Sequence, residues 1–363
     1  MVRNGGRQSG SIVFRLKCHS TRKDSATFAA SIAVRTILLT ILKYILAFGI
    51  AIVLLWWSFS SLTDKDIADI KDVLRRADYL MVLPVVAVLT LSHIFRALRW
   101  QQLILPLGYH APAFQLFCGI MIGYVANQFI PRAGEIMRCT SISRYNKIPA
   151  EKLVGTIVAE RAFDMVSLIV ITLVTVFLQY NRISSYVHEI GSGIQNAFTS
   201  GATGTLIKIA VLLLVVVLGV WLYRKFREHR FAAFFMRVAK GVWHGLISIK
   251  DVKNKPLFLI YTILVWICYV FATWMGCLAL KETAHLDIDA GLAMLVFGTF
   301  GIIVAPGGLG AYPIAIQKTL SFYHIPETIG LASGWLLWLA QFVFNTIIGV
   351  LAWFALKVKY GRK

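Results

Sequence analysis

Runs of about twenty apolar residues limit what this chain can fold into more than any other feature. A helix needs about 20 such residues to cross the hydrocarbon core of a bilayer, and only a helix or a closed barrel satisfies its backbone there. Apolar residues make up 58% of the chain and charged residues 15%, against about 25% charged in a soluble domain. We therefore predict an all-α polytopic membrane protein with no sizeable soluble domain. About six transmembrane helices are expected, at about 37–57, 79–103, 153–179, 205–223, 257–280 and 328–356.

Two further apolar runs are interrupted by helix breakers. The first covers about 113–130 and stops at Pro131. The second covers about 290–304, stops at Ala305-Pro306-Gly307-Gly308 and resumes at about 312–323. Proline and clustered glycines disfavour regular helix, so neither run is predicted to be one continuous span.

The distribution of lysine and arginine indicates the orientation in the membrane. The basic leader 1–36 carries seven of these residues, 224–256 carries nine and the tail 357–363 carries four, whereas 180–204 carries one. Lysine and arginine concentrate in cytoplasmic loops. Both termini are therefore predicted to be cytoplasmic.

Two opposed re-entrant hairpins follow from this orientation. If 113–130 crossed the membrane fully, the nine positive residues of 224–256 would lie outside, against the rule. Every gap obeys the rule if 113–148 enters and leaves the membrane on the cytoplasmic side. The same count makes 290–325 re-enter from the outside.

The order of elements suggests an inverted repeat within a single transmembrane domain, 37–356. Each half, about 37–179 and about 205–356, contains two spans, a hairpin and a third span, and the halves start on opposite sides. In such repeats, interrupted segments at matching positions point to a binding site. Amphipathic segments at 67–78 and 229–249 are predicted to be interfacial helices, outside and inside respectively.

The net charge of +20 does not indicate nucleic-acid binding, because the positive residues lie between apolar runs. That placement fits membrane topology and contact with anionic lipid head groups. The five cysteines are scattered, and neither they nor the eight histidines have the spacing of a metal site. No metal and no cofactor are therefore expected.

Polar groups at membrane depth cost about 2.5–3.5 kcal/mol each on insertion scales, which makes them candidates for function. The first group surrounds the break at Pro131. A helix restarting near Glu135 would point its N-terminal N–H groups into a cavity, and such helix ends bind phosphate. The alternative is an ordinary cytoplasmic loop whose arginines only follow the rule that positive residues concentrate on the cytoplasmic side. The candidate substrate-binding residues here are Asn127, Arg132, Gly134, Glu135 and Arg138.

The second group is Glu160, Arg161 and Asp164, seven to eleven residues into a span that starts near Leu153. At this position the residues lie roughly 10–17 Å deep, so they must face the protein interior. Glu160 and Asp164 share a helical face, and Arg161 can reach Asp164 at i, i+3 spacing. They are candidates for substrate binding, or for a structural ion-pair network that braces the hairpin through Arg132 or Glu135.

Two further groups complete the candidates. Arg96, Arg99 and Trp100 lie at the cytoplasmic end of the second span. They either snorkel beside an aromatic belt or contact lipid head groups. The late loop has three glycines and two prolines within 305–313, which predicts an unwound, close-packed loop inside the bundle. Its spacing lacks the lysine of a P-loop. The candidate residues in this loop are Pro306, Gly307, Gly308, Gly310 and Tyr312.

Together these groups resemble the flippase-like family, also called the lysylphosphatidylglycerol synthase transmembrane region, over about 37–356. The motifs are Asn-x-x-x-Pro-x-x-Gly-Glu from Asn127, Glu-Arg-x-x-Asp from Glu160, Pro-Gly-Gly-x-Gly from Pro306 and Arg-x-x-Arg-Trp from Arg96. The resemblance implies movement of phospholipids, such as aminoacylated phosphatidylglycerol, between leaflets. At Tyr312 the family often has a glutamate. Because the chain ends at Lys363, the aminoacyl-transfer domain of some members is not expected.

Three functions remain open. A flippase would hold a lipid phosphate between the hairpins through Arg132, Arg138 and Arg161, with the neighbouring carboxylates orienting these arginines or binding a cationic head group. A membrane transferase with a lipid-phosphate or polyprenyl-phosphate donor would use Glu135 or Asp164 as base. A non-catalytic scaffold is the third. The expected partners are membrane phospholipids and not nucleic acid, a homo-oligomer is allowed, and the expected location is the bacterial inner membrane.

Overall fold

The computed structural model describes residues 62–130, 133–180 and 252–361, together with scattered positions between 42 and 60 and Lys250. The chain divides into two compact units, Met1–Val53 and Leu54–Lys363, and the helices below belong to the second. Every regular element of this part is a helix. Their bounds are α2 Asp64–Arg75, η1 Tyr79–Met81, α3 Val82–Ile104, η2 Leu105–Leu107, α4 Ala113–Phe129, α5 Ala133–Asn146, α6 Ala150–Leu178, α10 Lys255–Cys277, α11 Ile288–Val304, η4 Pro306–Gly308, α12 Ala311–Ser321 and α13 Glu327–Tyr360.

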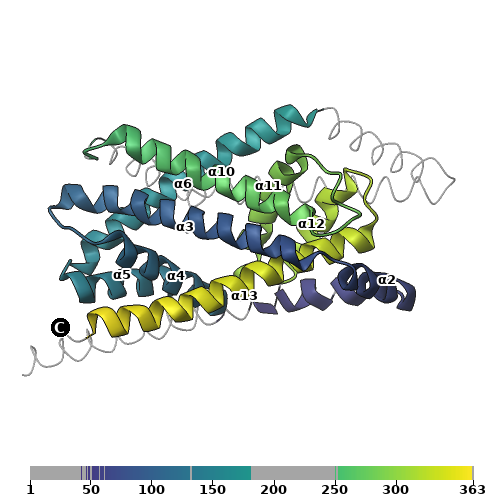
Figure 1. The fold of residues 1–363 in the computed structure, drawn as a ribbon, viewed down its shortest axis with the longest axis horizontal. Coiled ribbons are helices and arrows are strands. Elements are labelled where there is room, and N and C mark those ends of the chain that lie inside the picture. The colour runs from purple at the N-terminus through teal and green to yellow at the C-terminus, as the bar shows by residue number, and fades with distance from the viewer. Residues whose placement is uncertain are drawn as a thin grey trace, which may run out of the picture. The chain divides into compact units, whose positions relative to one another are not determined.

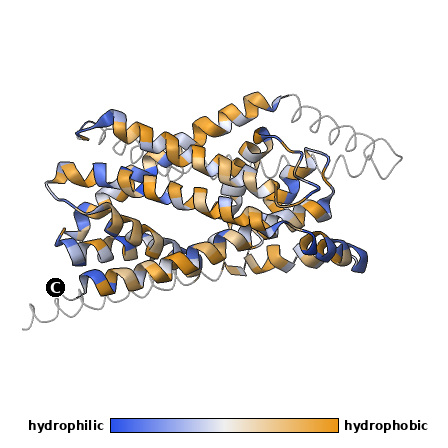
Figure 2. Ribbon diagram, in the orientation of Figure 1, coloured by the Kyte–Doolittle hydropathy of each residue, from blue (hydrophilic) through white to orange (hydrophobic). Residues whose placement is uncertain are grey.

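Among the described residues, four helical segments are long and apolar enough to cross a membrane: Tyr79–Leu107, α6, α10 and α13. Many of their exposed side chains are large and apolar. Phe177, Ile263 and Leu351, one from each of α6, α10 and α13, are more than half exposed, as expected for surfaces solvated by hydrocarbon. Figure 2 shows hydrophobic residues along these helices and hydrophilic residues gathered on α2. The predicted multi-pass helical fold is confirmed.

Some predicted elements lie outside the described residues. These are the leader, most of the span 37–57, the span 205–223 and the amphipathic segment 229–249. The outer amphipathic helix is present as α2, three residues earlier than predicted. It begins at a capping box in which Thr63 and Asp66 bind each other's backbone N–H groups.

The two interrupted runs form helical hairpins, as predicted. In the first, α4 and α5 lie so close that a Cβ added at Gly134 would stand 2.0 Å from the carbonyl oxygen of Gly123. In the second, a Cβ at Gly301 would stand 2.9 Å from the backbone of Ala311 and Tyr312. Glycine is required at such contacts because no side chain fits between the two backbones.

The described helices repeat one packing pattern twice. In the first half α3 packs on α4 and α5 on α6, and in the second half α10 packs on α11 and α12 on α13. The first arm of each hairpin also packs on the last helix of the other half, α4 on α13 and α11 on α6. Exchanging the two halves therefore turns the α4–α13 pair into the α11–α6 pair. Figure 1 shows α4 and α5 at the lower left and α11 and α12 to the right of them.

The halves run in opposite directions. At the start of α3, the Asp78 N–H donates to the carbonyl oxygen of Ala279, just beyond the end of α10 (2.8 Å). Further along the same pair, Phe95 stacks on Tyr261 with ring centroids 6.3 Å apart. As residue numbers rise on α3 they fall on α10, so the two helices are antiparallel and the repeat is inverted.

A short connector contains a residue with positive φ before an Ile-Pro pair in both halves. Lys147 and His324 have φ of 54° and 59°, in the left-handed region that residues other than glycine rarely adopt. Each precedes an Ile-Pro pair whose isoleucine, Ile148 or Ile325, is buried. The proline then leads into α6 in one half and α13 in the other.

Candidate functional site

A cluster of buried charges joins α3, α5 and α6. Arg96 and Arg99 are three residues apart on α3, and Glu160 and Asp164 are four apart on α6, so each pair shares one helical face. Arg99 contacts Asp164 at 2.7 Å and Glu160 at 3.4 Å, and Arg96 contacts Asp164 and, at 3.2 Å, Glu160. From α5, Arg138 donates to Glu160 at 2.7 Å.

The cluster has more positive than negative charges. Three arginines face two carboxylates, and the most exposed of the five side chains, Asp164, is 13% exposed. Removing charges from water costs several kcal/mol per ion, offset only by close pairing. The cluster therefore carries a net excess of one positive charge in a buried environment, where an anion is attracted more strongly than in water.

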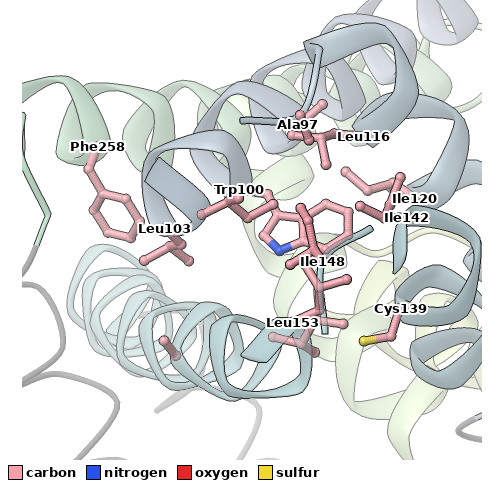
Figure 3. Packing of buried hydrophobic residues seen from close by; sticks show 14 of the residues in the cluster. Ala97, Trp100, Leu103, Leu116, Ile120, Cys139, Ile142, Ile148, Leu153 and Phe258 are labelled. Atoms are coloured by element: carbon pink, nitrogen blue, oxygen red, sulfur yellow. The ribbon is translucent and has the colours of Figure 1, made fainter. Parts of the chain in front are cut away.

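Trp100 packs against the charged cluster. The Arg138 guanidinium lies 3.7 Å from the centroid of the Trp100 ring, and the indole Nε1–H donates to Thr156 Oγ1 at 2.8 Å. Figure 3 shows the ring packed among apolar neighbours that include Leu116 and Ile142. Trp100 and Arg99 are fully buried. The snorkelling interpretation of Arg96, Arg99 and Trp100 is therefore wrong, because the three side chains are buried and both arginines form ion pairs inside the protein.

Two cluster neighbours were missed by sequence reasoning. Tyr124 on α4 accepts a hydrogen bond from Arg96, and the His93 ring on α3 packs against Tyr124 with ring centroids 4.8 Å apart. Each is a polar residue one helical turn before a candidate, Asn127 or Arg96, inside an otherwise apolar run. That spacing was the available signal.

Asn127 caps the second arm of the first hairpin. Its Oδ1 accepts a hydrogen bond from the N–H of Gly134 at 2.8 Å, and the N–H of Ala133 donates to Ile130. These two N–H groups at the start of α5 are therefore engaged within the protein and do not point freely into a cavity, as had been expected. Pro131 and Arg132 lie outside the described residues.

A small polar cavity lies between the hairpin and the cluster. Its volume is about 20 Å³, enough for about one water molecule. Arg161 and Glu135 form a 3.4 Å ion pair beside it, with side chains 46% and 41% exposed. The sequence had suggested Asp164 as the partner of Arg161, but Asp164 is engaged by α3. The lining residues are Arg96, Ile120, Gly123, Tyr124, Asn127, Gly134, Glu135, Arg138 and Arg161.

The late loop is separate from this cavity. Gly307, Gly308 and Gly310 have φ of 61°, 73° and 73°, and Trp338 on α13 donates to the carbonyl oxygen of Gly307 at 2.8 Å. The loop is unwound and close-packed, as predicted. Tyr312 is buried against Gly298 within the second hairpin.

The two hairpins nevertheless approach each other at their tips. A Cβ added at Gly307 would lie 3.4 Å from the carbonyl oxygen of Gln128. Gln128 is fixed to α13, because its Nε2 donates to Phe342 O and its Oε1 accepts from Thr346 Oγ1. The η4 turn Pro306–Gly308 thus lies beside α4. The cavity of the first hairpin is lined by none of Pro306, Gly307, Gly308, Gly310 and Tyr312.

The described residues contain no set of side chains that could bind a metal ion. Among residues 62–130, 133–180 and 252–361, no three His, Cys, Asp or Glu side chains are grouped to hold an ion. Three of the four charged side chains that line the cavity are arginines, which would repel a bare metal ion. The arrangement is suited to binding an anion.

Comparison with known proteins finds matches over most of the chain. Residues 44–349 match the family model described as the lysylphosphatidylglycerol synthase TM region. A UPF0104 membrane protein of Methanocaldococcus jannaschii is 20% identical over 282 residues, covering 73% of this chain and 81% of that protein. A UPF0104 membrane protein of Methanothermobacter thermautotrophicus is 22% identical over 302 residues, covering 78% and 88%. No solved structure matches.

Proposed function

The chain belongs to the lysylphosphatidylglycerol synthase transmembrane region family, and from this membership we propose that it moves a phospholipid between membrane leaflets. The substrate we propose is an anionic phospholipid or an aminoacylated one, both of which carry a phosphodiester anion. The spanning helices give the protein access to both leaflets, and the polar cavity offers the head group a path that avoids hydrocarbon.

The observation that carries this proposal is the arginine excess beneath the cavity. A phosphodiester carries one negative charge, which would neutralise the one uncompensated positive charge of the cluster. Arg96 and Arg138 both line the cavity, and arginine binds phosphate oxygens through paired hydrogen bonds. A lipid phosphate would therefore enter as the missing anion of an existing network.

The ion pair at the cavity supports the choice of head group. Arg161 and Glu135 are half exposed, so each can exchange its partner for a group of the substrate. Arg161 would contact the phosphate, and Glu135 would contact an ammonium group. The family description names an aminoacylated lipid, and Glu135 supplies the carboxylate that such a head group requires.

The described conformation is closed. A cavity of about 20 Å³ holds a water molecule and not a lipid head group, so transport requires the hairpin to move relative to α6. In inverted repeats, alternating access arises when one half rocks against the other around a fixed site. The Arg161–Glu135 pair joins α5 to α6 and would open in that step.

A leaflet-resolved assay tests the proposal. Fluorescent phosphatidylglycerol in proteoliposomes is bleached from outside by dithionite, and the protein should accelerate loss of the inner-leaflet signal over protein-free vesicles. Arg161→Gln should slow this rate about tenfold, the effect of losing a contact worth roughly 1.4 kcal/mol. Arg144→Gln is the matched control, because Arg144 is exposed on α5 and does not line the cavity.

The outcomes are distinct. No acceleration by the wild-type protein would rule out lipid transport under these conditions. Equal transport rates for Arg161→Gln and Arg144→Gln would be compatible with lipid transport. They would show that the head group does not pass through the cavity that Arg161 lines.

A further inference from the structure

One face of α13 contacts both hairpins near their tips. Trp338, Phe342 and Thr346 follow each other at intervals of four residues, so their side chains share that face. Trp338 Nε1 donates to the carbonyl oxygen of Gly307 in the second hairpin at 2.8 Å. The Trp338 and Phe342 rings stack with centroids 5.0 Å apart, which joins this contact to the next one along the helix.

The first hairpin is held by the following turn of the same face. Gln128 Nε2 donates to Phe342 O at 3.2 Å, and Thr346 Oγ1 donates to Gln128 Oε1 at 2.9 Å. The Phe129 and Phe342 rings meet edge to face, with centroids 6.3 Å apart. We call these contacts of Gln128 and Phe129 with Phe342 and Thr346 the tip contact. It joins the first half of the molecule to the second.

The tip contact can separate without leaving an unsatisfied hydroxyl group on α13. Thr346 Oγ1 also lies 2.8 Å from Phe342 O, four residues earlier on its own helix. A hydroxyl group has one proton to donate, so Thr346 can donate either to Gln128 or to its own helix. A buried donor left without an acceptor is costly, and this exchange avoids that cost.

Farther from the tip, α4 and α13 are packed more tightly. A Cβ added at Gly349 would lie 2.2 Å from Val125 Cγ2 and 2.7 Å from Met121 O, so no side chain fits between the helices there. The tip contact, in contrast, is made by side chains whose hydrogen bonds can be exchanged. The end of α4 can therefore leave α13 while the two helices stay in contact at Gly349.

The tip contact is adjacent to the cavity. Asn127, which lines the cavity and accepts from the N–H of Gly134, is the residue next to Gln128. The cavity of about 20 Å³ is too small for a head group, so a lipid binds only after the first hairpin has moved. That movement involves α4, because α4 and α5 are in close contact at Gly123 and Gly134.

We propose that Gln128 and Thr346 are positioning residues that hold the first hairpin closed, and that their hydrogen bond breaks before a phospholipid head group enters the cavity. The inference rests on the proposed lipid transport. The tip contact stabilises the closed conformation and need not touch the lipid. A ligand binds more weakly when its binding-competent conformation is rare. Removal of the tip contact should therefore tighten lipid binding.

Two substitutions remove these hydrogen bonds with little change in volume. Thr346→Val deletes the hydroxyl group, and Gln128→Met deletes the amide. Binding of dihexanoylphosphatidylglycerol, kept below its critical micelle concentration, is measured by titration calorimetry on the full-length protein in detergent. The affinity of Thr346→Val should rise about fivefold, the effect of one hydrogen bond that is made only in the closed conformation. The thermal stability of both variants without the probe should fall.

The two residues should act through one hydrogen bond. Thr346→Val should therefore raise the affinity of the wild-type protein and leave that of Gln128→Met unchanged, in a double-mutant cycle. The matched control is Thr90→Val on α3. The Thr90 hydroxyl donates to Val86 O of its own helix at 2.7 Å, so its loss should not change the affinity for the probe.

The outcomes separate this inference from the proposed function. Tighter binding together with lower stability would support it, since a purely structural contact would lower the stability without raising the affinity. Binding by the wild-type protein that is unchanged or weaker in both variants would overturn the inference and leave the lipid site in place. If neither the wild-type protein nor the variants bind the probe, the proposed lipid site fails and the inference fails with it.

Discussion

Glu160 is the residue on which the buried cluster depends most. It is fully buried and lies within 3.4 Å of Arg96, Arg99 and Arg138. Glu160→Gln leaves three buried guanidinium groups with one carboxylate. Removing one partner of a buried pair costs about 3–5 kcal/mol, so we expect a loss of this order in the free energy of unfolding, measured by denaturant titration in detergent.

A second carboxylate provides the comparison. Glu135 pairs with Arg161 at 3.4 Å, but its side chain is 41% exposed. Exposed ion pairs contribute up to about 1 kcal/mol, so Glu135→Gln should change the free energy of unfolding by no more than that. If Glu160→Gln and Glu135→Gln lowered the free energy of unfolding equally, the result would contradict the difference in burial between the two carboxylates.

At the residue scale, the sequence identified candidates but not their partners. Polar residues within apolar runs pointed to Arg138, Glu160 and Asp164 because of their cost in lipid. Local spacing then suggested that Arg161 pairs with Asp164, whereas α3 supplies the arginines that Asp164 contacts. Spacing describes only neighbours on one helix. Pairing between α3 and α6 depends on tertiary packing, which one sequence does not encode in any local pattern.

At the scale of elements, the first hairpin depends on the close approach of its two arms. Gly134→Ala would put a methyl group 2.0 Å from Gly123 O and 2.6 Å from the Asn127 side chain. The arms must separate, and overpacking of this kind costs about 1–3 kcal/mol. We expect that loss in the free energy of unfolding, together with slower lipid transport, because Asn127 also lines the cavity.

Gly155 on α6 is the matched control. A Cβ added there meets nothing within 4 Å, and alanine is favoured over glycine inside a helix by about 0.5–1 kcal/mol. Gly155→Ala should therefore be neutral or stabilising. Destabilisation by both substitutions to the same extent would show that backbone crowding at Gly134 is not the cause.

The hairpins were predictable because proline, glycine and the lysine and arginine counts agreed. Pro131 and the glycines after Pro306 marked the breaks, and the charge rule required each run to return to its own side. The repeated connector was not predicted. Lys147 and His324 adopt the left-handed conformation, which sequence patterns signal mainly through glycine. The Ile-Pro pairs that follow them were the available clue.

At the scale of the molecule, the two halves share a scaffold but not a chemistry. Among the described residues, every buried charged side chain lies in the first half: Arg96, Arg99, Arg138 and Glu160. The buried polar residues of the second half, such as Thr262, Ser333 and Asn345, are neutral. The candidate site is therefore single, and the second hairpin contributes packing at the tip of the first. The order of apolar runs in the sequence predicted the inverted architecture. The asymmetry between the halves became visible only from which side chains the structure buries.

The inverted repeat also predicts that matching connectors face opposite sides of the membrane. The α3–α4 connector lies beside the chain's end, where Lys359 stands over the Phe114 ring at 5.0 Å. The α10–α11 connector leads to the other end, where Gln179 Nε2 donates to Asp289 O at 2.7 Å. The charge rule assigns the first end to the cytoplasm and the second to the outside.

Cysteine labelling can test this sidedness at two exposed histidines, His110 on the first connector and His285 on the second. The native cysteines Cys118, Cys139, Cys268 and Cys277 are buried, so a Cys18→Ser background should react little with a membrane-impermeant maleimide. In right-side-out vesicles His285→Cys should be labelled and His110→Cys protected, and inverted vesicles should reverse the result. Labelling of both from one face would contradict the inverted repeat, because an inversion must place equivalent connectors on opposite surfaces.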